Sequence, residues 1–358
     1  MAGRFSATDV PLRIINSIAL ETRIAPETHL SRMICSPMQT CVYVHNKLLH
    51  GLAKLGDGQL LQPEDMVADP TEMFLYTTNS DGWIKKYYLS NGSVENWVNV
   101  GGRPLAIALG NEGEVLVCEP VQGQLIGVDK LGTKEILATE AGGIEFGLID
   151  AVTVSSNGLI YFTDASTKHP LGTWHFDMLE GQVSGRIAVY NPEDKSTRVL
   201  LDELYFPNGI ALSKSEDHFI NCETTVARCM KFFLRGEKEG TIKTFIENLP
   251  GHPDNIHRNL KNGRFYIGIP GNRNGLTDFV ARTPVAKQIL AFSPVLYKLL
   301  DMRKMGRVFE VDPSGKPLQV YEDPTGEVIG FVTTVVEVDW YLYVGGFRDS
   351  FAGRIKVH

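Results

Sequence analysis

The sequence predicts an all-β protein, a six-bladed β-propeller, from two observations. First, a similar segment recurs six times, and in each copy a proline or another apolar residue precedes a key position that opens a β-rich run. The key positions are Glu64, Leu105, Asp150, Asn208, Asp254 and Thr333. Second, further β-rich runs follow each copy at similar intervals. Repeats of about 40–50 residues are typical of propellers, in which each repeat forms one four-stranded blade.

The strands of each blade can be assigned in order. Innermost strands begin in the runs 63–67, 104–108, 149–153, 207–211, 253–257 and 332–336. Second strands are expected at 74–77, 115–118, 159–162, 219–222, 265–268 and 342–345. Third strands are expected at 83–87, 125–128, 185–190, 229–233, 306–311 and 353–357. These runs are rich in β-branched and aromatic residues and are bounded by Gly, Asn and Asp, which is typical of strands joined by turns.

The outer strands predict how the ring closes. Five blades have a candidate outer strand, at 97–99, 135–137, 198–201, 245–247 and 318–321. The sixth blade has none, because the chain reaches His358 directly after its third strand. An open edge would expose unpaired backbone groups, so we expect residues 48–54 to supply the missing strand. The chain then divides into an N-terminal extension, 1–46, and a propeller, 47–358.

Two insertions interrupt the repeat, at 165–184 in the third blade and at 270–305 in the fifth. The second contains helix-like stretches at 285–290 and 294–300, with apolar residues three and four apart. Long insertions in compact domains often act as lids, so we expect both to cover one end of the channel. Their apolar and aromatic residues predict a small-molecule substrate that is partly apolar.

Composition narrows the classes of partner and location. The net charge of −7 provides no basic face for nucleic acid, and no run of about 18 apolar residues could span a membrane. The N-terminus lacks the apolar core of a signal peptide, which leaves a cytosolic location open. Cys35 and Cys41 could close a disulfide in an oxidising compartment, but the odd count of five cysteines favours free thiols.

Four of the key positions carry oxygen ligands. Innermost strands of all blades line one axis, so Glu64, Asp150, Asn208 and Asp254 should face one another, with Asn255 as a further oxygen. Buried carboxylates repel each other unless a proton or a cation neutralises them. Carboxylate and amide oxygens suit a hard cation, calcium above magnesium. The alternative is that these side chains only cap turns, as Asx residues often do.

Several runs carry a resemblance to a known family. They lie at 81–85 (DGWIK), 101–105 (GGRPL), 150–154 (DAVTV), 161–166 (YFTDAS), 176–181 (FDMLEG), 222–224 (CET) and 249–256 (LPGHPDNI). In order, these runs resemble the strictosidine synthase-like family, which includes the adipocyte plasma membrane-associated proteins. More distant similarity extends to paraoxonases and to gluconolactonases such as regucalcin. The resemblance covers about 47–358 and implies a six-bladed propeller in the secretory pathway.

The resemblance also implies roles for the axial residues. In the lactonase relatives a calcium ion on the axis is held by positions that match Glu64, Asp150, Asn208, Asp254 and Asn255. Asp150 stands where those relatives usually have asparagine, which adds a negative charge. Strictosidine synthase uses a glutamate in its sixth blade as acid and base, and that position is Thr333 here. A hydroxyl has no useful pKa near neutrality for that reaction.

These inferences lead to three functional hypotheses. The first is metal-assisted hydrolysis of a lactone or an aryl ester, with Asp254 as general base by resemblance to the gluconolactonases and His252 and His175 as weaker candidates. For His252 the alternative is a surface turn histidine, and for His175 a lid residue that packs on Trp174. The second hypothesis is a specialised-metabolism enzyme that condenses, cyclises or isomerises its substrate without the missing glutamate. The third is a ligand-binding propeller without turnover.

Overall fold

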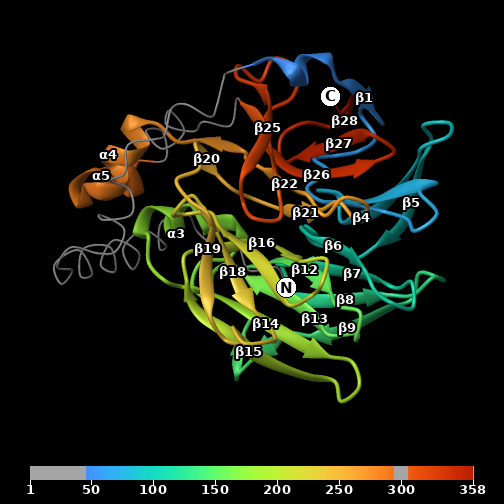
Figure 1. The fold of residues 1–358 in the computed structure, drawn as a ribbon, viewed down its shortest axis with the longest axis horizontal. Coiled ribbons are helices and arrows are strands. Elements are labelled where there is room, and N and C mark those ends of the chain that lie inside the picture. The colour runs from blue at the N-terminus through green and yellow to red at the C-terminus, as the bar shows by residue number, and fades with distance from the viewer. Residues whose placement is uncertain (1–45, 294–304, 358) are drawn as a thin grey trace, which may run out of the picture.

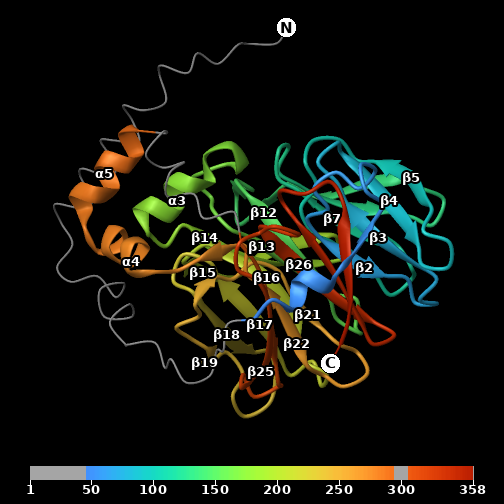
Figure 2. The ribbon, with the colours of Figure 1, turned by 90° about the horizontal axis from the view of Figure 1, so that it is seen from above.

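The computed structural model describes residues 46–293 and 305–357 and shows a six-bladed β-propeller (Figures 1 and 2). Within these residues, six antiparallel sheets of four strands surround one axis. The strands of blades one to three are β2 (Met66–Ala68), β3 (Phe74–Thr78), β4 (Trp83–Tyr88) and β5 (Val94–Asn99); β6 (Ile107–Leu109), β7 (Val115–Glu119), β8 (Gln124–Val128) and β9 (Lys134–Ala138); and β12 (Ile149–Val154), β13 (Ile160–Asp164), β14 (Gly185–Asn191) and β15 (Ser196–Leu204). The predicted fold class is confirmed.

The strands of blades four to six are β16 (Pro207–Leu212), β17 (His218–Glu223), β18 (Arg228–Phe233) and β19 (Ile242–Ile246); β21 (Ile256–Arg258), β22 (Phe265–Gly268), β24 (Gly306–Val311) and β25 (Pro317–Asp323); and β26 (Val332–Val338), β27 (Tyr341–Gly346), β28 (Ala352–Lys356) and β1 (Ala53–Leu55). Two small two-stranded sheets lie outside the blades, β10 (Glu140–Ala141) with β11 (Ile144–Glu145), and β20 (Gly251–His252) with β23 (Gly271–Asn272).

The ring closes through the N-terminal segment, as the sequence predicts. Strand β1 pairs antiparallel with β28, so that Ala53 lies opposite Arg354 and Leu55 opposite Ala352. The strand is shorter than expected, because the preceding residues form the short 3-10 helix η1 (Leu48–Gly51). This helix buries Leu49 completely and packs against β25 of the fifth blade. The segment therefore joins the fifth and sixth blades as well as completing the sheet.

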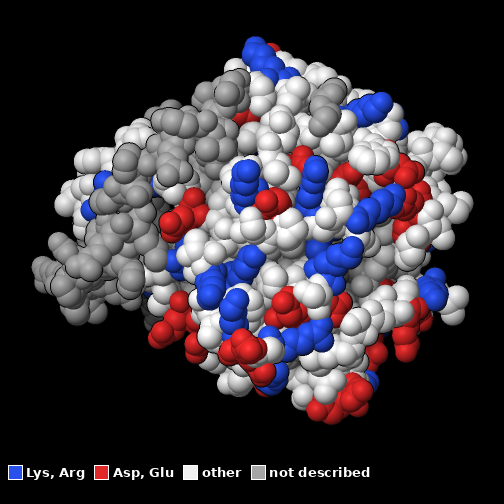
Figure 3. All heavy atoms as spheres, viewed as in Figure 1, with Lys and Arg blue, Asp and Glu red and all other residues white. Residues whose placement is uncertain are grey.

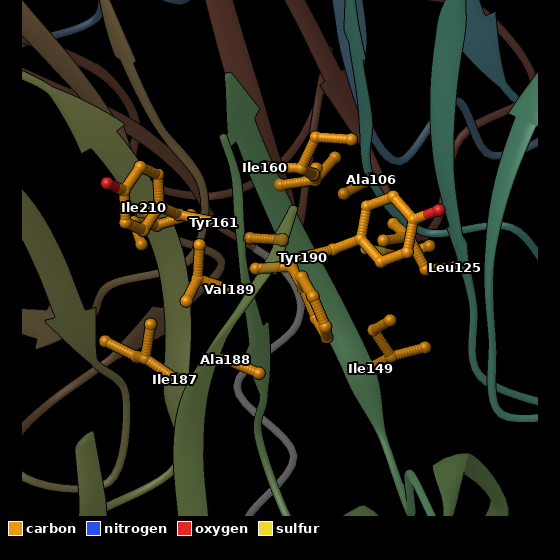
Figure 4. Close-up of a cluster of buried hydrophobic side chains, with 14 of the residues drawn as sticks. Ala106, Leu125, Ile149, Ile160, Tyr161, Ile187, Ala188, Val189, Tyr190 and Ile210 are labelled. Atoms are coloured by element: carbon orange, nitrogen blue, oxygen red, sulfur yellow. The ribbon is translucent and has the colours of Figure 1, made fainter. Parts of the chain in front are cut away.

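Apolar side chains between adjacent blades form the core. Figure 4 shows one such cluster, in which Ile149, Ile187 and Tyr190 of the third blade pack with Leu125 of the second and Ile210 of the fourth. All five side chains are at most 4% exposed. Packing between blades, rather than within one blade, buries these faces, which explains why the closed ring is the stable unit.

Glycine allows the innermost strands to approach closely at two positions. A Cβ atom on Gly209 would lie 2.5 Å from the carbonyl oxygen of Asp254, and one on Gly268 would lie 2.2 Å from that of Thr333. No side chain fits at these positions without moving the neighbouring backbone. The two glycines thus hold the inner strands of blades four, five and six together directly beside the axial residues.

Both insertions contain helices on the same side of the propeller (Figure 2). The first contains the 3-10 helix η2 (Leu171–Thr173) and α3 (Trp174–Glu180). The second contains α4 (Gly275–Arg282) and α5 (Pro284–Phe292), and α5 includes the helix expected at 285–290. Helix α5 contacts both α3 and α4. The helix expected at 294–300 lies outside the described residues.

The prediction that the cysteines are free is wrong for two of them. Cys222 and Cys229 form a disulfide between β17 and β18, where they lie directly opposite each other. The available sequence signal was a separation of seven residues across a hairpin. Cys118 is free and buried, and Cys35 and Cys41 lie outside the described residues.

Charged side chains of both signs cover the face in Figure 3, and the described helices are short. On the face in Figure 3, basic and acidic side chains are interspersed rather than gathered into one basic patch. Among the helices of the described residues, none is long and apolar enough to cross a membrane.

Candidate functional site

The structure brings five of the six key positions together around one cavity. Its volume is about 240 Å³, and it lies at the axis below the two insertions. Its floor contains one residue from each of five blades, located within two positions of the start of the inner strand: Glu64, Leu105, Asp150, Asn208 and Asp254. Repeat symmetry explains this convergence, because equivalent positions of successive blades face the same axis.

The floor concentrates buried negative charge. Glu64 is 2% exposed, Asp150 4% and Asp254 9%. Burial raises the pKa of Glu64 well above its usual value, and repulsion from Asp254, Asp65 and Asp150 raises it further. Burial, followed by the charge of Asp254, likewise raises the pKa of Asp150. Three carboxyl groups held this close cannot all ionise unless a cation balances them.

Asp254 is the third carboxyl group of the floor whose pKa is raised. Burial raises its pKa to about 7, while a hydrogen bond from Asn208 opposes the rise and the charge of Asp65 adds to it. Asp65 lies next to the floor but has its own partners. It contacts the ring of His257 at 2.7 Å and accepts the hydroxyl of Thr334 at 2.7 Å. Asp65 therefore has hydrogen-bond partners of its own, whereas Glu64 and Asp254 each keep an oxygen without one in the described part of the chain.

Three buried oxygen atoms of the floor have no hydrogen-bond partner among the described residues. They are Oε2 of Glu64, Oδ1 of Asn208 and Oδ1 of Asp254. Burying such atoms without a partner costs free energy, so these positions fit a ligand that accepts oxygen lone pairs. Calcium prefers this set of carboxylate and amide oxygens. No three His, Cys, Asp or Glu side chains in 46–293 and 305–357 already form a metal cluster, so calcium stays a prediction.

Two predicted floor residues lie behind the cavity wall rather than in it. Asn255 donates its side-chain amide to Oε1 of Glu64 at 3.0 Å, so it orients Glu64 and points its nitrogen at that carboxylate. Thr333 is 1% exposed and donates its hydroxyl to the backbone carbonyl of Glu64 at 2.6 Å. Both residues hold the strand that carries Glu64. The sixth blade contributes Phe331 and Phe347 to the cavity instead.

The two histidine candidates have different positions. His252 lines the cavity, and its Nδ1 lies 2.9 Å from the carbonyl oxygen of Thr224. Because that carbonyl can only accept, Nδ1 carries the proton and Nε2 keeps its lone pair. Burial lowers the pKa of His252, which favours this neutral form. His175 is not among the residues that line the cavity. It lies in α3, half-buried, and stacks on Phe176 with ring centroids 4.3 Å apart.

Sequence reasoning missed Arg103, which lies behind the floor. Arg103 is 8% exposed, and its guanidinium stacks on the Phe347 ring at 4.4 Å. Burial lowers its pKa to about 10, while attraction to Glu64 opposes that decrease. The available signal was its place two residues before Leu105, within the 101–105 run. Arg103 adds a positive charge near Glu64.

The upper wall is apolar and comes largely from the insertions. Its apolar side chains include Leu171, Trp174, Met178, Leu290, Phe331 and Phe347. Two cationic side chains, Arg273 and Lys287, also line the cavity, and both belong to the second insertion. Sequence reasoning identified the insertions as lids but not these two cations, because helix packing decides which polar side chains turn inward.

Comparisons with known proteins agree with this architecture. A family model described as strictosidine synthase matches residues 150–237, and one described as strictosidine synthase-like, N-terminal, matches 42–87. The strictosidine synthase-like 6 protein of Arabidopsis thaliana is 37% identical over 97% of this chain and 93% of its own length. The adipocyte plasma membrane-associated protein of Homo sapiens is 30% identical over 90% of this chain and 81% of its own length.

Solved structures with a similar fold include two propellers. A gluconolactonase of Xanthomonas campestris superposes with a TM-score of 0.63 at 14% identity, covering 88% of this chain and 94% of that one. A calcium-binding protein, the regucalcin of Agrobacterium tumefaciens, superposes with a TM-score of 0.56 at 13% identity, covering 86% of this chain and 94% of that one. At this identity, the two structures show the shared fold.

Proposed function

The chain belongs to the strictosidine synthase-like family, and on that premise we propose that it is a hydrolase that opens a lactone or an ester at the propeller axis with a bound calcium ion. The observation that carries the proposal is the set of three unpartnered buried oxygens, from Glu64, Asn208 and Asp254, on the floor of one cavity. Buried oxygens without a partner cost free energy, and a bound ligand that contacts them removes that cost.

The floor residues have separate roles in this proposal. Glu64, Asp150, Asn208 and Asp254 would hold the ion, and Asn255 orients Glu64 through its 3.0 Å hydrogen bond. A bound calcium ion would supply Lewis-acid polarisation of the substrate carbonyl. The charges also balance, because three carboxylates meet one divalent cation and the guanidinium of Arg103. Asp150, which adds a charge relative to an asparagine, is compatible with the site for that reason.

The proton of the attacking water needs an acceptor on the cavity wall. Asp254 is the first candidate, because its carboxyl group lines the cavity beside the proposed ion. His252 is the second, because its Nδ1 is engaged by Thr224 and its Nε2 is left as an acceptor. The apolar rings of Phe331 and Phe347 limit the entry of other water. His175 has no role in this proposal, since it does not line the cavity.

The test measures metal and turnover on the full chain. Protein purified without chelator should contain about one calcium ion per chain, and its melting temperature should fall when EGTA is added and recover with calcium but less with magnesium. Phenyl acetate and small lactones should be hydrolysed, and EGTA should abolish the hydrolysis. Protein that binds no calcium and hydrolyses none of these substrates would overturn the proposal. A compound that raises the melting temperature without being consumed would favour a binding propeller.

We do not propose condensation of an amine with an aldehyde. The hydroxyl of Thr333 is committed to the carbonyl of Glu64 and does not line the cavity, so this position supplies no acid or base. Replacing Thr333 with glutamate and assaying that condensation checks the point. Activity in the Thr333→Glu variant would show that only this side chain separates the chain from a condensing enzyme.

We also propose that the protein works in the secretory pathway. The Cys222–Cys229 disulfide supports this location, because disulfides persist in oxidising compartments. Mass spectrometry of protein isolated from its native tissue under alkylating conditions tests the bond. Finding both thiols alkylated would contradict this location.

A further inference from the structure

Lys287 is a buried cation in the lid over the axial cavity. It belongs to α5, lines the cavity and is 9% exposed. The same cavity wall includes the apolar side chains Leu290, Leu179 and Met178. An ammonium group is costly to bury in such surroundings unless an anion or several acceptors lie beside it. The position of Lys287 therefore needs an explanation.

The other cationic side chain of the wall, Arg273, has side-chain partners that Lys287 lacks in the part of the chain that the structure describes. Arg273 donates to Oδ1 of Asp278 at 2.7 Å and to Oδ1 of Asn248 at 2.8 Å. Nζ of Lys287 has three N–H donors, yet among the described residues it makes one long hydrogen bond, 3.4 Å, to the backbone carbonyl of Glu180. The Glu180 carboxylate itself contacts Lys168 at 2.6 Å and His169 at 3.3 Å. Lys287 thus forms no ion pair with a described side chain.

The cavity therefore has acidic side chains at its floor and a cationic side chain in its lid. Its floor carries the carboxyl groups of Glu64, Asp150 and Asp254, its lid carries Lys287, and the wall includes rings and aliphatic side chains. A substrate with an anionic end would be attracted to the lid, while its apolar part packs against the wall. This orientation places the other end of the substrate at the floor. Burial lowers the pKa of Lys287, the charge of Glu180 opposes that decrease, and a bound anion would favour the charged form further.

We propose that Lys287 binds a substrate carboxylate, so that the substrates are apolar esters or lactones that carry a carboxylate at the end away from the bond that is broken. This inference rests on the proposed function for the identity of that bond. Recognition of the carboxylate by Lys287 does not require turnover, and it can be measured separately. Lys287 is a specificity-determining residue in this view, because it contacts the substrate but not the reacting carbonyl.

The binding test uses two probes of similar shape, 4-phenylbutyrate and its neutral amide, with isothermal titration calorimetry. The wild-type protein should bind the carboxylate at least about tenfold more tightly than the amide. Lys287→Met should remove this preference, Lys287→Arg should retain most of it, and Lys243→Met, a change of an exposed lysine in β19, should leave it unchanged. Melting temperatures check that each variant folds. If Lys287→Met does not fold, Lys287→Gln replaces it.

A carboxylate could also bind a cation on the axis, and the same experiment separates the two. Each titration is repeated with calcium and with EGTA. A preference that survives Lys287→Met and disappears in EGTA would overturn the inference, and so would equal binding of the two probes by the wild type. A preference that depends on Lys287 under both conditions supports it.

A second readout uses turnover of phenyl hydrogen glutarate and of the neutral phenyl pentanoate. Lys287→Met should raise KM about tenfold or more for the anionic ester, with little change in kcat and no change for the neutral ester. A loss that is equal for both esters would contradict the inference. If the wild type hydrolyses neither ester, nor phenyl acetate and the lactones, and binds no calcium, the proposed function fails, and the calorimetric result still decides the role of Lys287.

Discussion

Two sets of buried carboxyl groups in this propeller have the same chemistry and different surroundings. In the strand-end set, Asp164 is fully buried, accepts the backbone N–H groups of Gly147 and Leu148, and pairs with Arg186 at 3.0 Å. Glu223 similarly accepts the N–H of Tyr205 and pairs with Arg228. In this set each buried carboxylate has an arginine and a backbone N–H group as partners.

The axial set is buried to a similar degree but lacks such partners. Glu64 and Asp254 each keep one oxygen without a hydrogen bond, and each repels the other. The two sets differ in what surrounds them, not in residue type or burial. The lesson is that burial of a carboxyl group does not by itself indicate function. A functional role is indicated where the surrounding chain leaves a buried carboxyl group without a hydrogen-bond or charge partner.

The largest expected effect is on the strand-end set. Arg186→Met leaves Asp164 buried without its cation and should lower the free energy of unfolding by about 3–5 kcal/mol, because an uncompensated buried charge is strongly destabilising. Urea denaturation monitored by circular dichroism measures it. The control is Lys195→Met, which removes an ion pair to Glu135 between exposed side chains and should change stability little. Equal stability of the two variants would show that the strand-end contacts contribute less than we infer.

The matching change in the axial set should affect activity instead of stability. Asp254→Asn removes a repulsive carboxyl group, so the melting temperature in EGTA should stay equal or rise. Hydrolysis of phenyl acetate should fall about 100-fold or more, because the same residue is a proposed ligand and base. Reduced stability in EGTA together with normal activity would place Asp254 in the strand-end class. The His252→Gln variant separates the two candidates for the general base. A large loss of hydrolysis in this variant would indicate that His252 accepts the proton of the attacking water.

A smaller effect concerns Asp323, which joins the N-terminal segment to the fifth blade. Burial raises the pKa of Asp323, but N–H groups of Val328 and Ile329 and the ring of His50 lower it more, and the net pKa is depressed. A depressed pKa stabilises the fold above the unfolded-state value of about 3.9, and this contribution is lost as the pH falls through the folded-state pKa. Asp323→Asn should therefore cost about 1 kcal/mol at pH 7.

The pH series provides the check on Asp323. Urea denaturation at pH 7, 5 and 3 should show that the difference between the wild type and Asp323→Asn shrinks toward acid. A difference that stays constant with pH would mean that shape, not charge, matters at this position.

The smallest expected effect is at His175. Because this ring packs in α3 and does not line the cavity, His175→Phe should change kcat/KM less than about twofold, well below the general-base effects of 10²-fold or more. Steady-state kinetics with phenyl acetate measures it. A loss of 100-fold would mean that the lid moves His175 into the cavity during the reaction.

Much of the architecture followed from the order of residues alone. The six recurrent segments predicted six blades and the convergence of Glu64, Asp150, Asn208 and Asp254, because equivalent positions in a closed ring must face one axis. The closing strand was predicted from the missing outer strand of the sixth blade. These inferences succeeded because they depend on local periodicity and on repeat symmetry, both of which are visible in the chain itself.

Only the tertiary structure decided what each axial residue contacts. In the structure, Thr333 and Asn255 lie behind the cavity wall and His175 lies outside the cavity. Cys222 and Cys229 form a disulfide. The tertiary structure also brought Arg103 and Lys287 to the site from segments that carry no repeat signal. The physical reason is that partnership and burial arise between segments distant in sequence. Periodicity predicts which positions meet, whereas packing determines which of their atoms remain without a partner.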